Sequence, residues 1–200
     1  MNPATRFRTP GRLAGVFACR GVGQVRQERS FLMASKTLTQ NELLSVLPQE
    51  GEVTWIGLRP ERRQTLLEVE QVEATTEEGL IGDRYSSKAS RARQVTLIQS
   101  EHLAAAGSML HREPLDPGVV RRNIVVKGVN LLAFKNQQFR VGTAVLKFTG
   151  LCHPCSRMEE VLGAGGYNAM RGHGGITAEV IQSGCIKIGD AVALCSETAD

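Results

Sequence analysis

The sequence predicts a mainly β (α+β) fold, a β-barrel with a few short peripheral helices. Short runs of alternating apolar and polar residues recur along the chain, and glycine, proline and aspartate turn signals separate them. Helical segments are few, and they do not alternate with strands as they do in a parallel α/β sheet. About six to eight strands and about two or three helices are therefore expected, in a chain long enough to enclose a core.

The first 33 residues differ in composition from the remainder. They contain six arginines and a single acidic residue, a net charge of +5, whereas the remainder has 18 basic and 19 acidic residues. Residues 1–33 are interpreted as a basic leader, which is a disordered tail, an organelle transit peptide or a segment upstream of a true start at Met33. Residues 34–200 are expected to form one domain.

Charge and hydropathy restrict the partners and the location of the protein. The near-neutral body gives no electrostatic reason to expect nucleic acid as a partner. The apolar stretch of the leader, Val16-Phe17-Ala18-Cys19, is too short for a secretory signal or a membrane span. A cytoplasmic protein without a membrane span is therefore expected, with its five cysteines serving as metal or redox ligands rather than as a disulfide framework.

Hydrophobic periodicity and cap signals place the elements in the first half of the chain. Thr39 is a plausible N-cap for a helix with Leu38, Leu43, Leu44 and Leu47 on one face, and Pro48 closes that helix. A later run alternates apolar with acidic residues, as a strand with one solvent-facing side does. The expected elements are a helix at 37–47, strands at 52–58 and 65–74, a glycine bend at 79–85, a basic loop at 86–93, a strand at 93–98 and a helix capped by Ser100 that ends near Leu110.

The second half of the chain contains the same kinds of signal. Asp116-Pro117-Gly118 marks a turn, and the run Ile124-Val125-Val126 is typical of a buried strand. The remaining expected elements are an alternating strand at 139–148, a helix at 156–162, a flexible glycine-rich loop at 163–175, and a closing hairpin formed by 176–181 and 186–194.

Two cysteines lie where a strand passes into a helix, at Cys152-His153-Pro154-Cys155. Thiols near the N-terminus of a helix face unpaired N–H groups, and His153 and Arg157 act in the same direction, so the thiolate form is favoured. A thiolate is the form that attacks a substrate or binds a metal. The alternative is a pair of half-buried, unreactive cysteines.

Basic side chains gather at two further places. Arg121, Arg122 and Asn123 precede the buried strand, and guanidinium forks bind phosphate or carboxylate in a bidentate way. The loop at 86–93 is small, polar and basic, so an anionic group could order it. The alternatives are surface charge beside a strand and a solvated loop.

Five segments, taken together, resemble the MOSC domain, the module named for the C-terminal part of eukaryotic molybdenum-cofactor sulfurases and also found as small stand-alone bacterial proteins. Their order and spacing over about residues 50–195 make the resemblance specific, although each segment is weak alone. The aminotransferase-like desulfurase domain of the sulfurases is absent, so the chain cannot itself withdraw sulfur from free cysteine. The segments are Gly82-Asp83-Arg84-Tyr85, Arg93-Gln94-Val95-Thr96-Leu97-Ile98, Arg122-Asn123-Ile124-Val125-Val126, Cys152-His153-Pro154-Cys155-Ser156-Arg157 and Gly184-Cys185-Ile186-Lys187-Ile188-Gly189-Asp190.

The resemblance implies that the molybdenum cofactor (molybdopterin) is bound. It implies that Cys155 is the metal ligand, because in related reductases a cysteine at this place in the motif binds the metal. A soft thiolate suits an oxo-molybdenum centre. Related motifs do not all have a cysteine at the place of Cys152, which is expected to be a neighbouring catalytic thiol or a persulfide carrier. The residues implied to hold the pterin phosphate and ring edge are Arg122 and Asn123, with Arg93 and Arg84 as further contacts.

The resemblance also implies a reductase of small N-hydroxylated compounds. Because the sequence has no flavin or nicotinamide motif, electrons are expected from an external donor protein. The glycine-rich segment at 163–175 is a candidate lid or docking surface, or a plain connection. The alternative function is a non-catalytic module that carries molybdenum cofactor or sulfur.

Two other kinds of protein use paired cysteines. A thioredoxin-like oxidoreductase places CxxC near the start of a βαβ unit, whereas here about 45 residues follow the motif and have the pattern of a hairpin. A structural zinc site needs a second cluster of ligands at metal-binding spacing, and the sequence shows none. Both are weaker hypotheses than a molybdenum-binding protein.

Overall fold

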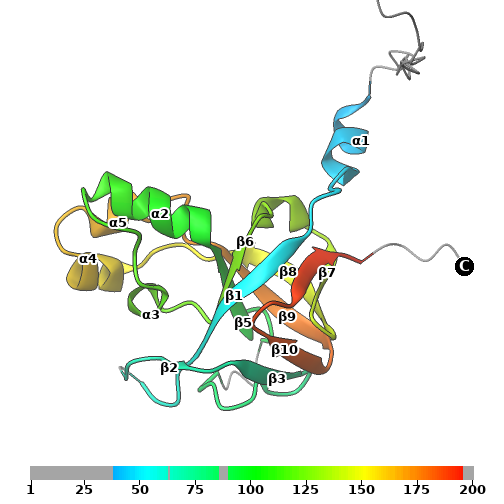
Figure 1. Ribbon diagram of the computed structural model, residues 1–200, viewed down its shortest axis with the longest axis horizontal. Helices are drawn as coiled ribbons and strands as arrows, with labels where there is room; N and C mark the ends of the chain where they lie inside the picture. Colours follow the sequence, from blue (N-terminus) through cyan, green and yellow to red (C-terminus); the bar gives the residue numbers. More distant parts are fainter. Residues whose placement is uncertain (1–37, 63, 86–89, 196–200) are drawn as a thin grey trace, which may run out of the picture. The chain divides into compact units, whose positions relative to one another are not determined.

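The computed structural model of the chain describes residues 38–62, 64–85 and 90–195, and it confirms a mainly β fold flanked by short helices (Figure 1). The predicted leader at 1–33 and residues 86–89 of the predicted basic loop lie outside the described residues. The elements are α1 (Gln40–Ser45), β1 (Gly51–Leu58), β2 (Leu67–Glu68), β3 (Gln71–Thr75), β4 (Gly79–Leu80), β5 (Val95–Gln99), α2 (Ser100–Met109), α3 (Pro117–Val120), β6 (Ile124–Lys127), the 3-10 helix η1 (Leu131–Phe134), β7 (Gln138–Val141), β8 (Ala144–Leu151), α4 (Ser156–Leu162), α5 (Gly166–Ala169), β9 (Ile176–Gln182), β10 (Gly184–Lys187) and β11 (Ala191–Leu194).

Seven strands close into a barrel. They are hydrogen-bonded in the order β1, β6, β5, β9, β8, β7 and β11, and β11 pairs with β1 to complete the ring. Strand β2 pairs with the other end of β1, while β10, β3 and β4 form a separate three-stranded sheet. Closure satisfies the strand edges that an open sheet would expose.

Strands β5 and β6 are parallel, and α2 and α3 connect them. Parallel strands need such a crossover, so this is one βαβ unit, in a chain whose other described strand pairs are antiparallel. Nearly every residue of these two strands is buried, on both faces, as is usual where helices cover parallel strands.

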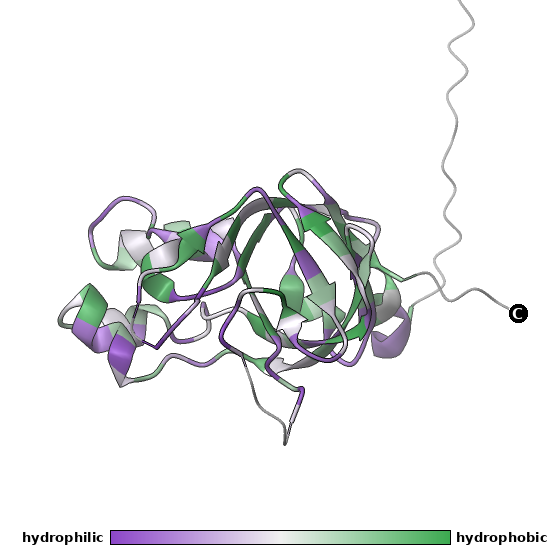
Figure 2. Cartoon of the chain, turned by 90° about the horizontal axis from the view of Figure 1, so that it is seen from below, coloured by the Kyte–Doolittle hydropathy of each residue, from purple (hydrophilic) through white to green (hydrophobic). Residues whose placement is uncertain are grey.

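Two apolar clusters lie on opposite sides of this part of the barrel wall. Leu97 and Ile124 point into the barrel, whereas Ile98 and Val125 pack against the helices. Figure 1 shows α2, α3, α4 and α5 gathered on that side, and Figure 2 shows hydrophobic residues recurring along the strands. Each fully buried side chain of this size contributes about 1.5–3 kcal/mol. The helix layer consists of Leu103, Ala106, Leu115, Val120, Met158, Leu162 and Met170.

Two predicted strands are divided in the structure. The run at 139–148 is a hairpin of β7 and β8 that turns at Gly142, whose φ of 58° lies in the left-handed region. The run at 65–74 is interrupted by Val69 and Glu70 and forms β2 and β3 in different sheets.

The predicted closing hairpin is wrong. Strand β9 pairs with β5 and β8, β10 pairs with β3, and β11 pairs with β7 and β1. The chain therefore leaves the barrel after β9, adds β10 to the three-stranded sheet, and returns to the barrel with β11.

The helix ends agree only in part with the predicted caps. Thr39 caps α1 through a capping box with Glu42, although Leu43 and Leu44 of the predicted apolar face are exposed. Gln99 rather than Ser100 occupies the N-cap of α2. Within the described ranges, no helix is long and apolar enough to cross a membrane.

The predicted loop at 163–175 contains α5. The Glu159 carboxylate accepts hydrogen bonds from the backbone N–H groups of Gly165 and Tyr167, each at 2.8 Å. These contacts fix the start of the segment to α4.

Candidate functional site

Strand register brings several chain segments together at one end of the barrel. Ile56 of β1 pairs with Ile124 of β6, and Ile124 pairs with Leu97 of β5. Leu97 pairs with Ile176 of β9, which also pairs with Leu151, the last residue of β8. The segments that meet at this level are 57–59 after β1, 121–123 before β6 and 152–155 after β8.

A hollow of about 190 Å³ lies between these segments. Four arginines and both predicted cysteines line it, and its lining contains no carboxylate among the residues that the structure describes. The structure thus brings together four of the predicted site residues, Arg93, Arg122, Cys152 and Cys155. The lining residues are Arg59, Arg93, Thr96, Arg121, Arg122, Cys152, His153, Pro154, Cys155 and Met158.

Cys155 is the exposed thiol of this hollow. It occupies the N-cap of α4, where its side chain makes no capping hydrogen bond, and its carbonyl accepts from the N–H of Met158 at 2.8 Å. The backbone thus holds the residue in place while the sulfur remains accessible. An accessible, unengaged thiol can bind a metal or attack a substrate.

Cys152, in contrast, is 3% exposed. Its sulfur lies 3.8 Å from Nη2 of Arg93, and its N–H donates to the carbonyl of Gly175 at 2.8 Å. The second thiol is therefore buried, with a guanidinium group beside its sulfur.

Arg122 joins three parts of the site. Its Nε donates to the carbonyl of Gly174 at 2.7 Å, Nη1 to that of Val120 at 2.7 Å and Nη2 to that of Cys152 at 3.3 Å. Burial lowers the pKa of the guanidinium, but an arginine remains a cation at neutral pH. With three of its five N–H groups engaged, two remain for an anion.

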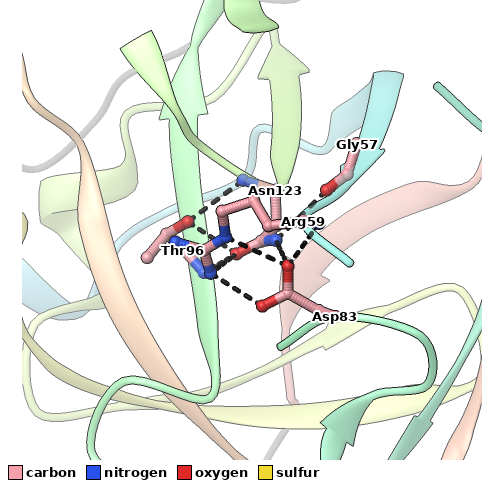
Figure 3. A network of polar contacts seen from close by, with 5 residues as sticks. All are labelled: Gly57, Arg59, Asp83, Thr96 and Asn123. Carbon is pink, nitrogen blue, oxygen red and sulfur yellow. Dashed lines mark hydrogen bonds and ion pairs between the residues drawn. The ribbon is translucent and has the colours of Figure 1, made fainter. Parts of the chain in front are cut away.

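Asn123 belongs to a buried network behind the hollow (Figure 3). Its Oδ1 accepts from the N–H and hydroxyl of Thr96 and from Arg59, at 3.2, 2.7 and 3.2 Å. Its Nδ2 donates to the carbonyl of Gly57 and to Asp83, each at 3.1 Å. These bonds occupy the amide fully, so Asn123 positions its neighbours rather than facing a ligand in this arrangement.

Replacing Asn123 with alanine is expected to lower the free energy of unfolding by about 3 kcal/mol or more, because buried donors and acceptors on Thr96 and Gly57 lose their partner and a cavity forms. Urea unfolding measures this loss. The exposed Asn168 is the matched control, and Asn168→Ala is expected to change the free energy by less than about 0.5 kcal/mol. Similar values for the two variants would contradict the structural role of Asn123.

Arg59 is a site residue that the sequence prediction left out, whereas Arg121 was noted among the basic residues before the buried strand but was not assigned to the cofactor. The carboxylate of Asp83 accepts hydrogen bonds from the backbone N–H, Nε and Nη2 of Arg59, at 2.7, 3.0 and 2.8 Å. The Asp83 side chain is fully buried. Arg121 adopts a left-handed backbone, φ 60° and ψ 41°, between α3 and β6. That conformation ends the helix abruptly, and two consecutive arginines then line the hollow. The position of Arg59 directly after a predicted strand was the available signal.

Positive charge extends beyond the first hollow. Burial, followed by the charges of Arg59, Arg157 and Arg84, lowers the pKa of Arg121. Arg121 also lines two neighbouring hollows, of about 270 and 480 Å³. The predicted residue Arg84 lies in the 270 Å³ hollow rather than beside the cysteines. The 270 Å³ hollow also contains Glu160, which pairs with Arg157 at 2.9 Å, so the cysteine-lined hollow is the one of the three whose described lining has arginines and no acidic residue. Such an excess of positive charge favours an anionic ligand there.

The cysteine turn also borders a smaller hollow, of about 130 Å³. His102 of α2 lines it and meets His173 edge to face, with ring centroids 5.1 Å apart. His102 Nδ1 is buried and has no hydrogen-bond partner among the described residues. Burial first, and the neighbouring His173 second, lower the pKa of His102, while Glu101 opposes them.

A pH dependence of stability follows from His102. Its pKa is lower in the folded chain than in the unfolded chain, so the unfolded state binds more protons as the pH falls through the usual histidine range. Unfolding free energy is therefore expected to fall between about pH 7.5 and 5.5, and to fall less in His102→Phe. Urea titrations at several pH values measure both slopes, and equal slopes would contradict the prediction.

No metal-binding group of three or more histidine, cysteine or acidic side chains occurs within residues 38–62, 64–85 and 90–195. The four cysteines in these ranges are all free.

Known proteins share this fold. The MOSC domain model matches residues 82–193, more than half of the chain. The YuaD protein from Bacillus subtilis has 14% sequence identity and a TM-score of 0.62, covering 73% of this chain and 96% of that one. YiiM from Geobacillus stearothermophilus has 17% identity and a TM-score of 0.58, covering 74% and 77%. YiiM from Escherichia coli has 18% identity and a TM-score of 0.56, covering 74% and 72%.

No curated protein matches the sequence. The solved structures are similar in fold, and the domain match includes the glycine-aspartate turn, the arginine-asparagine pair and the cysteine turn. On this basis the chain belongs to the MOSC domain family.

Proposed function

We propose that the protein binds the molybdenum cofactor in the arginine-lined hollow, with Cys155 as the metal ligand, and that it reduces small N-hydroxylated compounds. The observation that carries this proposal is the placement of an exposed thiol beside four arginines without a carboxylate in the described lining. A soft thiolate binds molybdenum, and guanidinium groups bind the phosphate of the pterin.

The residues present fit such a cofactor. Asp83 fixes Arg59, and backbone carbonyls fix Arg122, so two cations are held in place before an anion binds. Arg121 and Arg93 have no acidic partner in the described part of the chain, so neither has to break an ion pair in order to bind an anion. A preorganised cationic site loses little conformational entropy on binding.

The reaction consumes two electrons and two protons, converting R–NHOH to R–NH₂ and water. The bound cofactor would supply a centre that exchanges two electrons with the substrate. The chain would supply the thiolate of Cys155 and the cationic frame around it. His153 lines the same hollow and is exposed, so its imidazole is the proposed proton donor.

Electrons would come from a donor protein. The glycine-rich residues 163–175 run from α4 through α5 to β9 rather than from a strand into a helix, which is not the arrangement of a dinucleotide site. We place the protein in a reducing compartment such as the cytoplasm, because this chemistry requires free thiols.

The test is to load the full chain with the cofactor, measure molybdenum by elemental analysis, and follow reduction of an N-hydroxylated base with a reduced viologen as electron source. Cofactor-dependent turnover would support the proposal. Stoichiometric binding without turnover would identify a carrier instead, and zinc in place of molybdenum would overturn both. Arg121→Ala should weaken cofactor binding by about ten- to a hundredfold, whereas Arg140→Ala, on an exposed position of β7, should not.

A further inference from the structure

The hollow of about 130 Å³ beside the cysteine turn has the size of a small ring. An engineered apolar cavity of about 150 Å³ binds benzene, so this volume accommodates one six-membered ring. Its walls come from η1, the end of β8, the start of β9 and the glycine segment before β9.

The lining is mainly apolar. Leu131 and Ile176 form buried walls, while Leu132 and Leu151 line the hollow and are 47% and 46% exposed. Exposed leucines at the edge of a concave surface are typical of a ligand site, because they are covered only when a ligand is present.

The charge of this hollow differs from that of its neighbour. No arginine, lysine, aspartate or glutamate occurs among its described lining residues, and its ionisable side chains are His102, His153 and Cys152. The buried Nδ1 of His102 lacks a partner, which disfavours the charged imidazolium. The site therefore favours a neutral ligand, whereas the arginine-lined hollow favours an anion.

We propose that this hollow binds a neutral, planar ring with a small polar substituent, of benzamide size. Cys152, His153 and Pro154 border both hollows, so a ring held here lies against the turn that carries Cys155. If the protein is the reductase proposed above, this is the place of the substrate ring; ring binding itself does not depend on that function.

The experiment compares benzamide with benzoate, which have the same shape and differ in charge. Each is titrated into the full chain without added cofactor, and the imidazole C–H signals of His102 are followed by NMR, with His102→Phe assigning them. Benzamide is expected to shift these signals saturably with a dissociation constant on the order of 1 mM, and benzoate at least about tenfold more weakly.

The matched variants are Leu132→Trp, which fills the hollow from its exposed edge, and Leu43→Trp, at an exposed position of α1. The first should abolish the benzamide shift and the second should leave it unchanged. Absence of a saturable shift, equal affinity for benzoate, or full binding by Leu132→Trp would overturn the proposal. Because the experiment uses neither cofactor nor turnover, such a failure would count against ring binding alone and not against the proposed molybdenum site.

Discussion

Replacing Cys155 with alanine is expected to abolish cofactor-dependent turnover while leaving the fold intact. The thiol is exposed and makes no capping hydrogen bond, so its removal should change the free energy of unfolding by less than about 0.5 kcal/mol. If the sulfur is the metal ligand, molybdenum retained after gel filtration should fall with activity. Turnover, metal content and urea unfolding measured on the same preparation separate a functional loss from a structural one.

The control for this experiment is Cys185→Ala, since Cys185 lies on β10 in the three-stranded sheet and lines none of the hollows described above. It should retain wild-type activity and metal. Full activity in Cys155→Ala would rule out the ligand assignment. Cys152→Ala should be milder if that buried thiol only neighbours the metal, and equally damaging if the two cysteines act as a dithiol.

Local sequence signals were sufficient for the elements that carry the site. The helix that begins at Ser156 and the buried strand after Asn123 occur as predicted, and the strand before Cys152 is the second half of the predicted run at 139–148. Each is specified by short-range periodicity together with a turn or cap residue. The spacing of the family motifs then indicated that these local pieces belong to one domain.

Strand pairing could not be predicted in the same way. The hairpin expected at the C-terminal end looked local, yet β10 pairs with β3 and β11 pairs with β1, more than a hundred residues away. Such contacts depend on which apolar faces complement one another in the closed barrel, and single-sequence periodicity does not record this. The parallel pair β5 and β6 was missed for the same reason.

The composition of the site also depended on distant contacts. Arg59 lies directly after the predicted strand at 52–58, and only its contact with Asp83, 24 residues later, directs it to the hollow. Asn123 was predicted to contact the cofactor, but the structure gives its amide five hydrogen bonds to four residues of the chain. A residue type indicates which bonds are possible, whereas the fold decides which of them remain free for a ligand.

Arg122→Ala is expected to reduce both stability and cofactor affinity. The variant leaves the carbonyls of Gly174, Val120 and Cys152 without their charged donor and opens a cavity, so unfolding free energy should fall by about 3–5 kcal/mol. Losing a charged contact to phosphate should weaken cofactor binding by about ten- to a hundredfold. Urea unfolding and a cofactor titration, performed at a temperature where the variant is folded, measure the two effects separately.

Two further variants decide what Arg122 does. Arg112 is the control, because it is exposed and donates to one backbone carbonyl, that of Leu162, at 2.9 Å. Arg112→Ala should lower the free energy of unfolding by no more than about 1 kcal/mol and leave cofactor affinity unchanged. Arg122→Lys keeps the charge but cannot reproduce the planar fork that reaches three carbonyls, so stability should remain below wild type while part of the affinity returns. Undiminished affinity in Arg122→Ala would mean that this guanidinium only ties the cysteine turn to the barrel, and that Arg59, Arg93 and Arg121 bind the anion without it.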